Sequence, residues 1–491
     1  MCSPCVRRSA LLAVFIVVTL ATSAVLSQAQ VGLLQLSDDT FTNRTSQHMT
    51  EVEPSAFTWG STIVTAFQVA RISGGGGADI GFATSTDGGA HWTNGYLPGI
   101  TIFQGNGTYQ AASDAAVAYD ALHGVWLIST LPIGTSSTTV AVSRSTDGVN
   151  WSNPFFVTKS GGPDKNWIAC DNTPTSKFYG HCYSEWDSTN AGELIQMSTS
   201  SDGGITWSPT VSTAGNDFGI GGLPLVKPNG VVIVPILGFN GFVQAFRSTN
   251  GGKKWTAAVN VGEFINHSEA GDIRSAGLPS AAIDAKGKVY VAWPDCRFRT
   301  NCSANDMVFS KSSTGTIWAA VKRIPIDPVT SGVDHFISGM AIEPGTYGTK
   351  AHIGLAYYYY PDSSCGNTCQ LFAGFIQSSS GGAKWSAPQT LGGPMDLSWL
   401  PDTFSGRMVA DYIAVGFGGG KAFPVFALAQ APTGSLFQEA IYTTTAGLEA
   451  ISPEFEVLSS VEDRPLPGAK SDHRLRPFVD NQVPRKPPER N

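Results

Sequence analysis

Charged side chains are scarce in this chain: Asp, Glu, Lys and Arg together make up 14% of its 491 residues. Long surface helices are usually rich in Glu and Lys. This composition, with 55 glycines and 12 tryptophans, therefore favours short strands joined by tight turns. The formal net charge is −7. Because binding to nucleic-acid phosphates needs a basic surface, we exclude nucleic acid as a partner.

Long hydrophobic runs are also missing, with one exception at the N-terminus. Two arginines precede an almost wholly apolar stretch at residues 9–20, and small residues permit cleavage after Ala24 or Ala29. This pattern predicts a signal peptide over residues 1–29. A secreted or periplasmic location follows, without stable membrane insertion after cleavage. Because the apolar run reaches about residue 26, an uncleaved membrane anchor is the alternative.

Cysteine is infrequent, with eight residues, and two of these precede the apolar run. The other six form three pairs that are close in sequence, which in an exported protein predicts disulfides. No pair is accompanied by the histidine spacing of a zinc finger, so we expect neither a metal site nor a cofactor. The expected disulfides are Cys170–Cys182, Cys296–Cys302 and Cys365–Cys369.

One short sequence recurs along the chain, and its first copy is STDGGAHW at Ser85–Trp92. Repeats of such units at intervals of 48 to 66 residues are typical of propeller blades. In each copy the Asp can accept backbone N–H bonds, the glycines supply positive φ, and the Trp can fold back between blades. We therefore interpret the box as structural. The further copies begin at Ser145, Ser200, Ser248, Ser312 and Ser378.

Each box follows a strand, two more strands precede it and a short fourth one follows, so one unit is a four-stranded antiparallel meander. The last unit lacks a box and an outer strand, which residues 31–36 can supply by pairing the two ends of the chain. First strands begin near Pro54, Asp114, Asn166, Leu223, Pro279, Phe336 and Met408. We predict an all-β chain with a seven-bladed β-propeller over residues 30–450, or a six-bladed ring with an extra C-terminal sheet. The Pro- and Arg-rich segment 451–491 is expected to be a disordered tail.

Strand alternation puts the boxes and the turns between first and second strands on one face of such a ring. Loops between second and third strands, and crossings into each new blade, share the other face, which we call the funnel face. Ionisable residues concentrate there, which predicts a binding site at the mouth of the central channel. They include Arg71, Asp114, Lys165, Glu185, Asp187, Glu269, Asp272, Arg274, Asp295, Arg297, Asp334, His335 and Arg407.

The boxes resemble the bacterial neuraminidase repeat, or Asp-box, superfamily, and the first blade, from Ile63 through Asp79 to Trp92, resembles the opening of a secreted sialidase. The resemblance implies three arginines on a substrate carboxylate, an Asp acid/base and a Tyr nucleophile activated by a Glu. By position Asp79 is the expected acid/base. Glu185 would pair with Tyr358, or with another tyrosine of residues 357–360, or with Tyr412. The expected arginine clamps are Arg71, Arg274, Arg297 and Arg407.

The chain departs from that family in two respects. Sialidases carry Arg-Ile-Pro on the first strand, where this chain has Glu53-Pro54-Ser55, and their catalytic domains have six blades. Three functions stay open: an exo-glycosidase for sialic-acid-type or other acidic sugars, a non-catalytic propeller that binds glycan or protein, and a lyase or hydrolase for other sugars that uses Asp295, Asp334 and His335. The expected partner is a carbohydrate or glycoconjugate, and the expected state is a monomer.

Overall fold

The computed structural model describes residues 1, 31–452, 456 and 458–459, so the predicted signal peptide lies outside the described residues. The segment from Val31 onward is built from antiparallel sheets, and an all-β fold is confirmed. Three sheets are four-stranded meanders, and the first two meanders of the chain share one eight-stranded sheet. Five 3-10 helices are also described, Thr189–Ala191, Thr300–Cys302, Gly348–Lys350, Gly366–Thr368 and Leu397–Trp399. Within the described residues no helix has the length and apolarity to cross a membrane.

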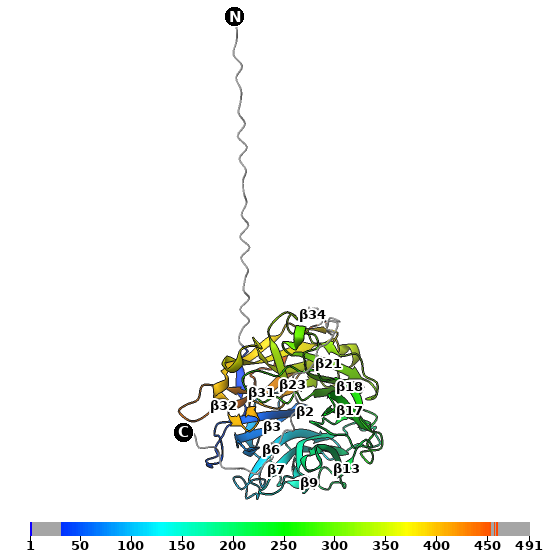
Figure 1. The fold of residues 1–491 in the computed structure, drawn as a ribbon. Helices are drawn as coiled ribbons and strands as arrows, with labels where there is room; N and C mark the ends of the chain where they lie inside the picture. The colour runs from blue at the N-terminus through cyan, green and yellow to red at the C-terminus, as the bar shows by residue number, and fades with distance from the viewer. Residues whose placement is uncertain (2–30, 453–455, 457, 460–491) are drawn as a thin grey trace. The chain divides into compact units, whose positions relative to one another are not determined.

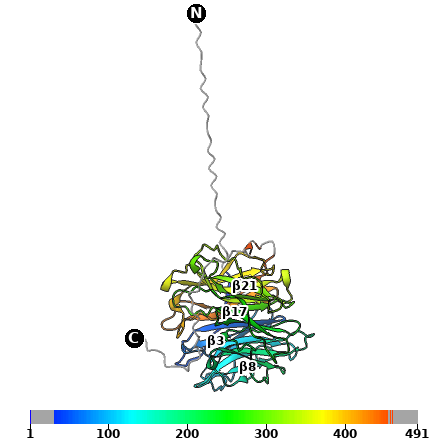
Figure 2. The same ribbon diagram turned by 45° about the vertical axis from the view of Figure 1, so that its right-hand side comes forward.

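Seven meanders follow one another along the chain, and the first two can be followed in Figure 2 from β3 and β8. The first is β2 (Glu51–Trp59), β3 (Thr62–Arg71), β4 (Gly77–Ser85) and β5 (Thr93–Tyr96). The second is β6 (Ala111–Asp120), β7 (Val125–Ile133), β8 (Val140–Ser145) and β9 (Phe155–Thr158). The third is β10 (Pro163–Cys170), β11 (Cys182–Ser188), β12 (Leu194–Ser200) and β13 (Val211–Ser212).

The fourth meander begins with a divided strand, β14 (Gly219–Ile220) and β15 (Leu225–Val226), followed by β16 (Val232–Gly238), β17 (Phe242–Ser248) and β18 (Val259–Glu263). The fifth is β19 (Ser280–Ile283), β20 (Val289–Asp295), β21 (Asp306–Ser312) and β22 (Lys322–Arg323). The sixth is β23 (Asp334–Ile342), β24 (Ile353–Tyr360), β25 (Gln370–Ser378) and β27 (Gln389–Asp396). The seventh is β30 (Ala414–Gly418), β31 (Lys421–Ala429), β32 (Glu439–Thr444) and β1 (Leu33–Gln35).

The two ends of the described segment meet in the seventh sheet, as predicted. β1 pairs antiparallel with β32, with Leu33 opposite Thr444 and Gln35 opposite Tyr442, so the blue strand lies beside the orange ones in Figure 1. A hydrogen bond from the Leu36 amide to the Ile441 carbonyl, 2.7 Å long, extends the pairing. An edge that would otherwise be open is thereby covered.

The first strands of successive sheets contact one another in cyclic order, from β2 through β6, β10, β15, β19 and β23 to β30, which in turn contacts β2. Apolar side chains fill the spaces between neighbouring sheets. One such cluster combines Val64 and Ile80 of the first sheet with Val117 and Ile128 of the second. The alternating apolar residues of the strands thus have two buried faces, one toward each neighbouring sheet.

The boxes form turns held by their own side chains, as expected. In the first copy the Asp87 carboxylate accepts the amides of Ala90 and His91, at 3.1 and 2.9 Å, and the Gly89 amide donates to Ser85 Oγ. Gly89 has a φ of 95°, which an L side chain rarely adopts. The Trp92 indole then donates to the Gly89 carbonyl at 3.1 Å and packs edge-on against Phe423 of the seventh sheet.

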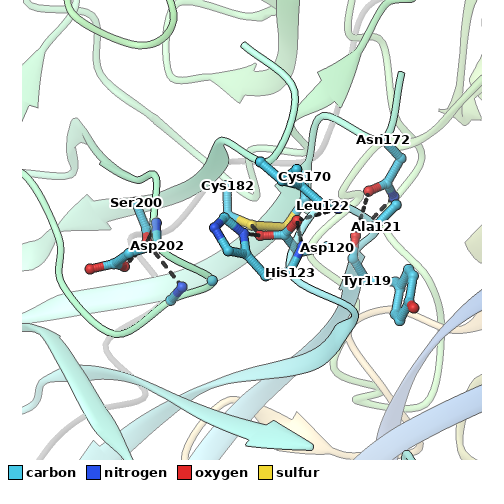
Figure 3. The surroundings of a disulfide bond; sticks show 12 residues. Tyr119, Asp120, Ala121, Leu122, His123, Cys170, Asn172, Cys182, Ser200 and Asp202 are labelled. Atoms are coloured by element: carbon cyan, nitrogen blue, oxygen red, sulfur yellow. Dashed lines mark hydrogen bonds and ion pairs between the residues drawn. A yellow bond between two sulfur atoms is a disulfide. The ribbon is translucent and has the colours of Figure 1, made fainter. Parts of the chain in front are cut away.

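Three disulfides join the expected cysteine pairs. Figure 3 shows that the Cys170–Cys182 disulfide lies beside Asp120. The Asp120 carboxylate is hydrogen-bonded to the ring Nδ1 of His123 at 2.6 Å. Asn172 lies two residues after Cys170. Its side chain accepts a hydrogen bond from the Ala121 amide and donates one to the Tyr119 carbonyl. The disulfide therefore closes the loop between β10 and β11, and Asn172 in this loop holds it against the second meander.

Two structural features depart from the predicted boundaries. The last meander begins at Ala414 rather than near Met408, because Gly406–Arg407 pairs with Asp402–Thr403 in a separate hairpin. The expected tail is not wholly without structure, since β34 (Leu458–Ser459) pairs with β26 (Lys384–Trp385). Most of segment 451–491 lies outside the described residues.

Candidate functional site

Three of the four predicted arginine clamps gather around the segment 407–411. The Arg71 side chain donates from Nε to Met408 Sδ at 2.9 Å, and from Nη1 to the carbonyls of Ile72 and Gly76. The Arg274 amide donates to the Arg407 carbonyl at 2.7 Å. A strand end (Arg71), a crossing between two meanders (Arg274) and a hairpin (Arg407), far apart in sequence, thus meet in one part of the molecule.

Arg407 differs from the other arginines of this group in its partners. It is half-buried, and its Nη1 donates to the Gly271 carbonyl at 2.9 Å. In the part of the chain that the structure describes, no carboxylate lies within salt-bridge distance of it. Arg274, by contrast, is buried and forms a bidentate ion pair with the Asp411 carboxylate, in which Nε lies 2.7 Å from Oδ1. Arg407 therefore lacks the close carboxylate partner that Arg274 has.

The fourth predicted clamp, Arg297, lies outside this group. Its Nε and Nη2 both bond the Asp295 carboxylate at 2.7 Å, and Nη2 also donates to the Glu263 carbonyl. With both Asp295 oxygens engaged, this bidentate pair connects the loop after β20 to the end of β18 and offers no free fork to a ligand.

The three predicted catalytic residues lie in three different sheets, and each is fully buried. Asp79 is on β4 and accepts the Ile80 amide at 2.9 Å. Glu185 is on β11, and its carboxyl group packs against Gly222, where a Cβ would come within 2.2 Å of it. The Tyr358 hydroxyl, on β24, donates to the Ala427 carbonyl at 2.7 Å.

Burial raises the pKa of all three groups well above their ordinary values, and the Ile80 and Gly222 amides offset little of that for the two carboxyls. Burial therefore favours the neutral form of both carboxyl groups. Because the Tyr358 hydroxyl already donates to a backbone carbonyl, Glu185 is not positioned to activate it.

A buried network of charged residues occupies the centre of the ring of first strands. The Lys165 ammonium lies 2.5 Å from Asp411, 3.3 Å from Asp114 and 3.4 Å from Glu53. Asp411 is also the partner of Arg274. Five charged side chains from five sheets or crossings thus meet with at most 3% of their surface exposed.

The pKa directions in this network follow from its geometry. Burial by itself lowers the pKa of Lys165, but the three carboxylates raise it well above its usual value. Burial raises the pKa of Asp411, and the Arg274 and Lys165 charges outweigh that and hold it below its ordinary range. Glu53 is the exception, because burial raises its pKa more than Lys165 lowers it. The network therefore remains ionised around Lys165 and Asp411 at neutral pH.

A repeated β-bulge directs three of these side chains inward. Glu53, Asp114 and Lys165 each have positive φ, at 56°, 47° and 47°, where the register of the first strand shifts against the second. Left-handed backbone at a residue other than glycine costs on the order of 1–3 kcal/mol and is concentrated at functional sites. The bulge leaves Lys165 within reach of carboxylates from neighbouring sheets.

The sequence predicted Asp114 and Lys165 on the funnel face, but it did not predict Glu53 and Asp411 as members of one site with them. A signal was present, since Glu53, Asp114 and Lys165 stand at equivalent places in their first strands. Aligning the first strands of the units with one another, rather than the boxes, would have revealed it. Asp411 carries no such signal, because its unit starts with an irregular segment.

One group of residues has ligand types suitable for a metal ion. Ligand atoms of Asp306, Asp327 and His335 lie within 4.8 Å of one another. Arg299 and Arg323 already neutralise both carboxylates, at 2.8 to 2.9 Å for three of these contacts. Two guanidinium groups at these positions disfavour a cation, and we interpret the group as a structural ion network.

No family model matches the chain, and no curated protein matches its sequence. Solved structures that match include a Hadza microbial sialidase, 16% identical over 63% of this chain with a TM-score of 0.44. A protein of unknown function from Dyadobacter fermentans is 15% identical over 72% of this chain and 99% of its own, with a TM-score of 0.45. The NanB sialidase of Streptococcus pneumoniae is 13% identical over 86% of this chain and 71% of its own, with a TM-score of 0.43. The chain spans 64% of the length of the Hadza sialidase. The structural neighbours of this all-β chain thus include sialidases, at low identity.

Proposed function

We propose that the chain is an exported, seven-bladed propeller of the sialidase-like, Asp-box type. Seven consecutive meanders, cyclic contacts between their first strands and the pairing of β1 with β32 support the blade count. Three disulfides support passage through an oxidising compartment, in line with the predicted signal peptide.

We propose further that the funnel face binds acidic carbohydrate without cleaving it. The observation that carries this proposal is Arg407, a half-buried guanidinium without a carboxylate partner in the described chain, set beside Arg71 and Arg274. A sugar carboxylate needs such a donor, and charge-assisted hydrogen bonds are the strong ones. Asp79, Glu185 and Tyr358 are buried in separate sheets, which disfavours turnover.

Replacing Arg407 with Gln is expected to weaken binding of 3′-sialyllactose at least tenfold, because the variant loses one charge-assisted hydrogen bond to the sugar carboxylate. Titration calorimetry measures the affinity, and lactose, which lacks the carboxylate, should not bind detectably to either protein. The control is Arg247→Gln, on the fourth sheet, where the guanidinium bonds the Thr314 carbonyl. Equal affinity of wild type and Arg407→Gln for sialyllactose would contradict the proposal.

Hydrolysis is the second candidate, and Asp79 is the observation in its favour. A general acid must hold its proton at working pH, and burial raises the pKa of Asp79 in that direction. If the chain is a sialidase-type enzyme, it releases 4-methylumbelliferone from the corresponding sialoside, and Asp79→Asn lowers the rate at least a hundredfold with little change in binding. Absence of turnover in wild type, together with retained sialyllactose binding, selects the binding function instead.

A further inference from the structure

A cavity of about 470 Å³ lies inside the ring of first strands, on the side away from the predicted funnel site. All seven sheets contribute to its wall through their first strands or the turns that follow them. This volume is within the range of small-molecule sites, which is roughly 300–1,000 Å³. It belongs to the face that carries the boxes, opposite the face on which the sequence predicts a binding site.

The cavity opens at the ends of the first strands and closes at the charged network. Trp59, the last residue of β2, lines the cavity and is 40% exposed, and it stacks on Tyr119 with ring centroids 5.2 Å apart. At the other end Lys165, Asn166 and Tyr412 line it and are buried. The cavity is therefore a pocket with an aromatic rim and a polar floor.

The wall offers no free charge to a ligand. Its charged residues are Lys165, Asp284 and Glu343. Lys165 is held by three carboxylates, Asp284 accepts three backbone amides, and Glu343 bonds His352 at 2.9 Å. The rest of the wall is largely aliphatic or aromatic, with Leu, Ile, Val, Ala, Pro, Phe and Trp residues. An ionised ligand would lose its hydration without gaining a partner, whereas a neutral apolar body gains by burial.

The floor has two oxygens with spare hydrogen-bonding capacity. Asn166 donates through Nδ2 to Ser129 at 2.7 Å, but its Oδ1 has no partner among the described residues. The Tyr412 hydroxyl likewise has none, although its ring packs edge-on against Trp167. Buried polar atoms of this kind are costly unless something pairs with them. A ligand hydroxyl can donate to the amide oxygen or accept from the phenol.

From this geometry we infer that the box-face pocket binds a neutral amphipathic molecule, with its apolar body along the channel and a terminal hydroxyl at Asn166 or Tyr412. The ligand class is that of a medium-chain alcohol or alkylphenol. This site is separate from the proposed carbohydrate site, because the charged network lies between the pocket and the funnel face.

The test uses 1-octanol as the probe and octanoate as its anionic counterpart, each titrated calorimetrically into the mature chain. Saturable one-to-one binding of octanol is expected, with octanoate at least tenfold weaker because no free cation faces the pocket. Tyr412→Phe should weaken octanol two- to tenfold through loss of one hydrogen bond. Since this hydroxyl has no protein partner, the variant should fold normally.

Ala281→Phe provides a second, independent variant. Ala281 lines the pocket and is only partly buried, so a phenyl ring there occupies ligand space and should abolish octanol binding while sialyllactose binding is kept. Octanol that does not bind saturably up to its solubility overturns the inference. So does octanoate binding as tightly as octanol, or an octanol affinity that both variants leave unchanged. If Ala281→Phe does not fold, the ligand comparison and Tyr412→Phe still decide.

Discussion

Replacing Lys165 with Met is expected to lower the free energy of unfolding by about 3–5 kcal/mol at neutral pH. Lys165 faces Asp411, Asp114 and Glu53, and all four side chains are buried. Arg274 can still compensate Asp411 in the variant. Asp114 then loses the cation that faces it, and an uncompensated buried charge is among the most destabilising changes known for single residues.

Urea unfolding followed by tryptophan fluorescence measures this effect. The matched control is Lys253→Met, an exposed lysine in a box, which should change stability by less than about 0.5 kcal/mol. Adding Asp114→Asn to Lys165→Met removes the uncompensated carboxylate and should recover a large part of the loss. A Lys165→Met protein as stable as the Lys253→Met control would show that the network contributes nothing, and would contradict its role in joining the sheets.

The second large effect concerns Glu51 and pH. Burial raises the pKa of Glu51 from 4.5 to about 8, partly opposed by the hydrogen bond from Ser37. The folded chain therefore binds one more proton than the unfolded chain between these two values. The stability that this proton contributes is present in full below pH 4.5 and is lost as pH rises through 8.

Glu51→Gln should therefore become more stable relative to wild type as pH rises from 5 to 9, by up to about 4 kcal/mol. Gln keeps an oxygen that can accept the Ser37 hydroxyl, so the comparison isolates the charge. Urea unfolding at a series of pH values measures the difference. The control is Glu449→Gln, an exposed residue paired with Lys421, for which the difference from wild type should change little with pH. A constant difference between Glu51→Gln and wild type over this range would disprove the shift.

Local features of the sequence were sufficient for most of the fold. The box turns could be predicted from the sequence because their hydrogen bonds, such as those of Ser85, Asp87 and Gly89, all lie within one stretch of eight residues. The meander pattern follows from strand alternation, and the supply of an outer strand by residues 31–36 follows from an incomplete last unit. The irregular start of that unit was not predicted. The backbone of Arg407 pairs with that of Asp402 in a short hairpin and also forms a β-bridge with Ile273, which lies in a distant crossing.

The candidate site was predictable only in part, and the reason is physical. The sequence by itself determined the repeat, the disulfide pairs and the face on which ionisable residues gather, since these depend on spacing and alternation within one unit. Only the tertiary structure decided that Arg407 has no carboxylate partner while Arg274 does, that Tyr358 bonds a backbone carbonyl, and that Lys165 meets Glu53, Asp114 and Asp411. Those contacts join residues from different blades, and which side chains meet there depends on bulges and packing around the whole ring rather than on any neighbouring stretch of chain.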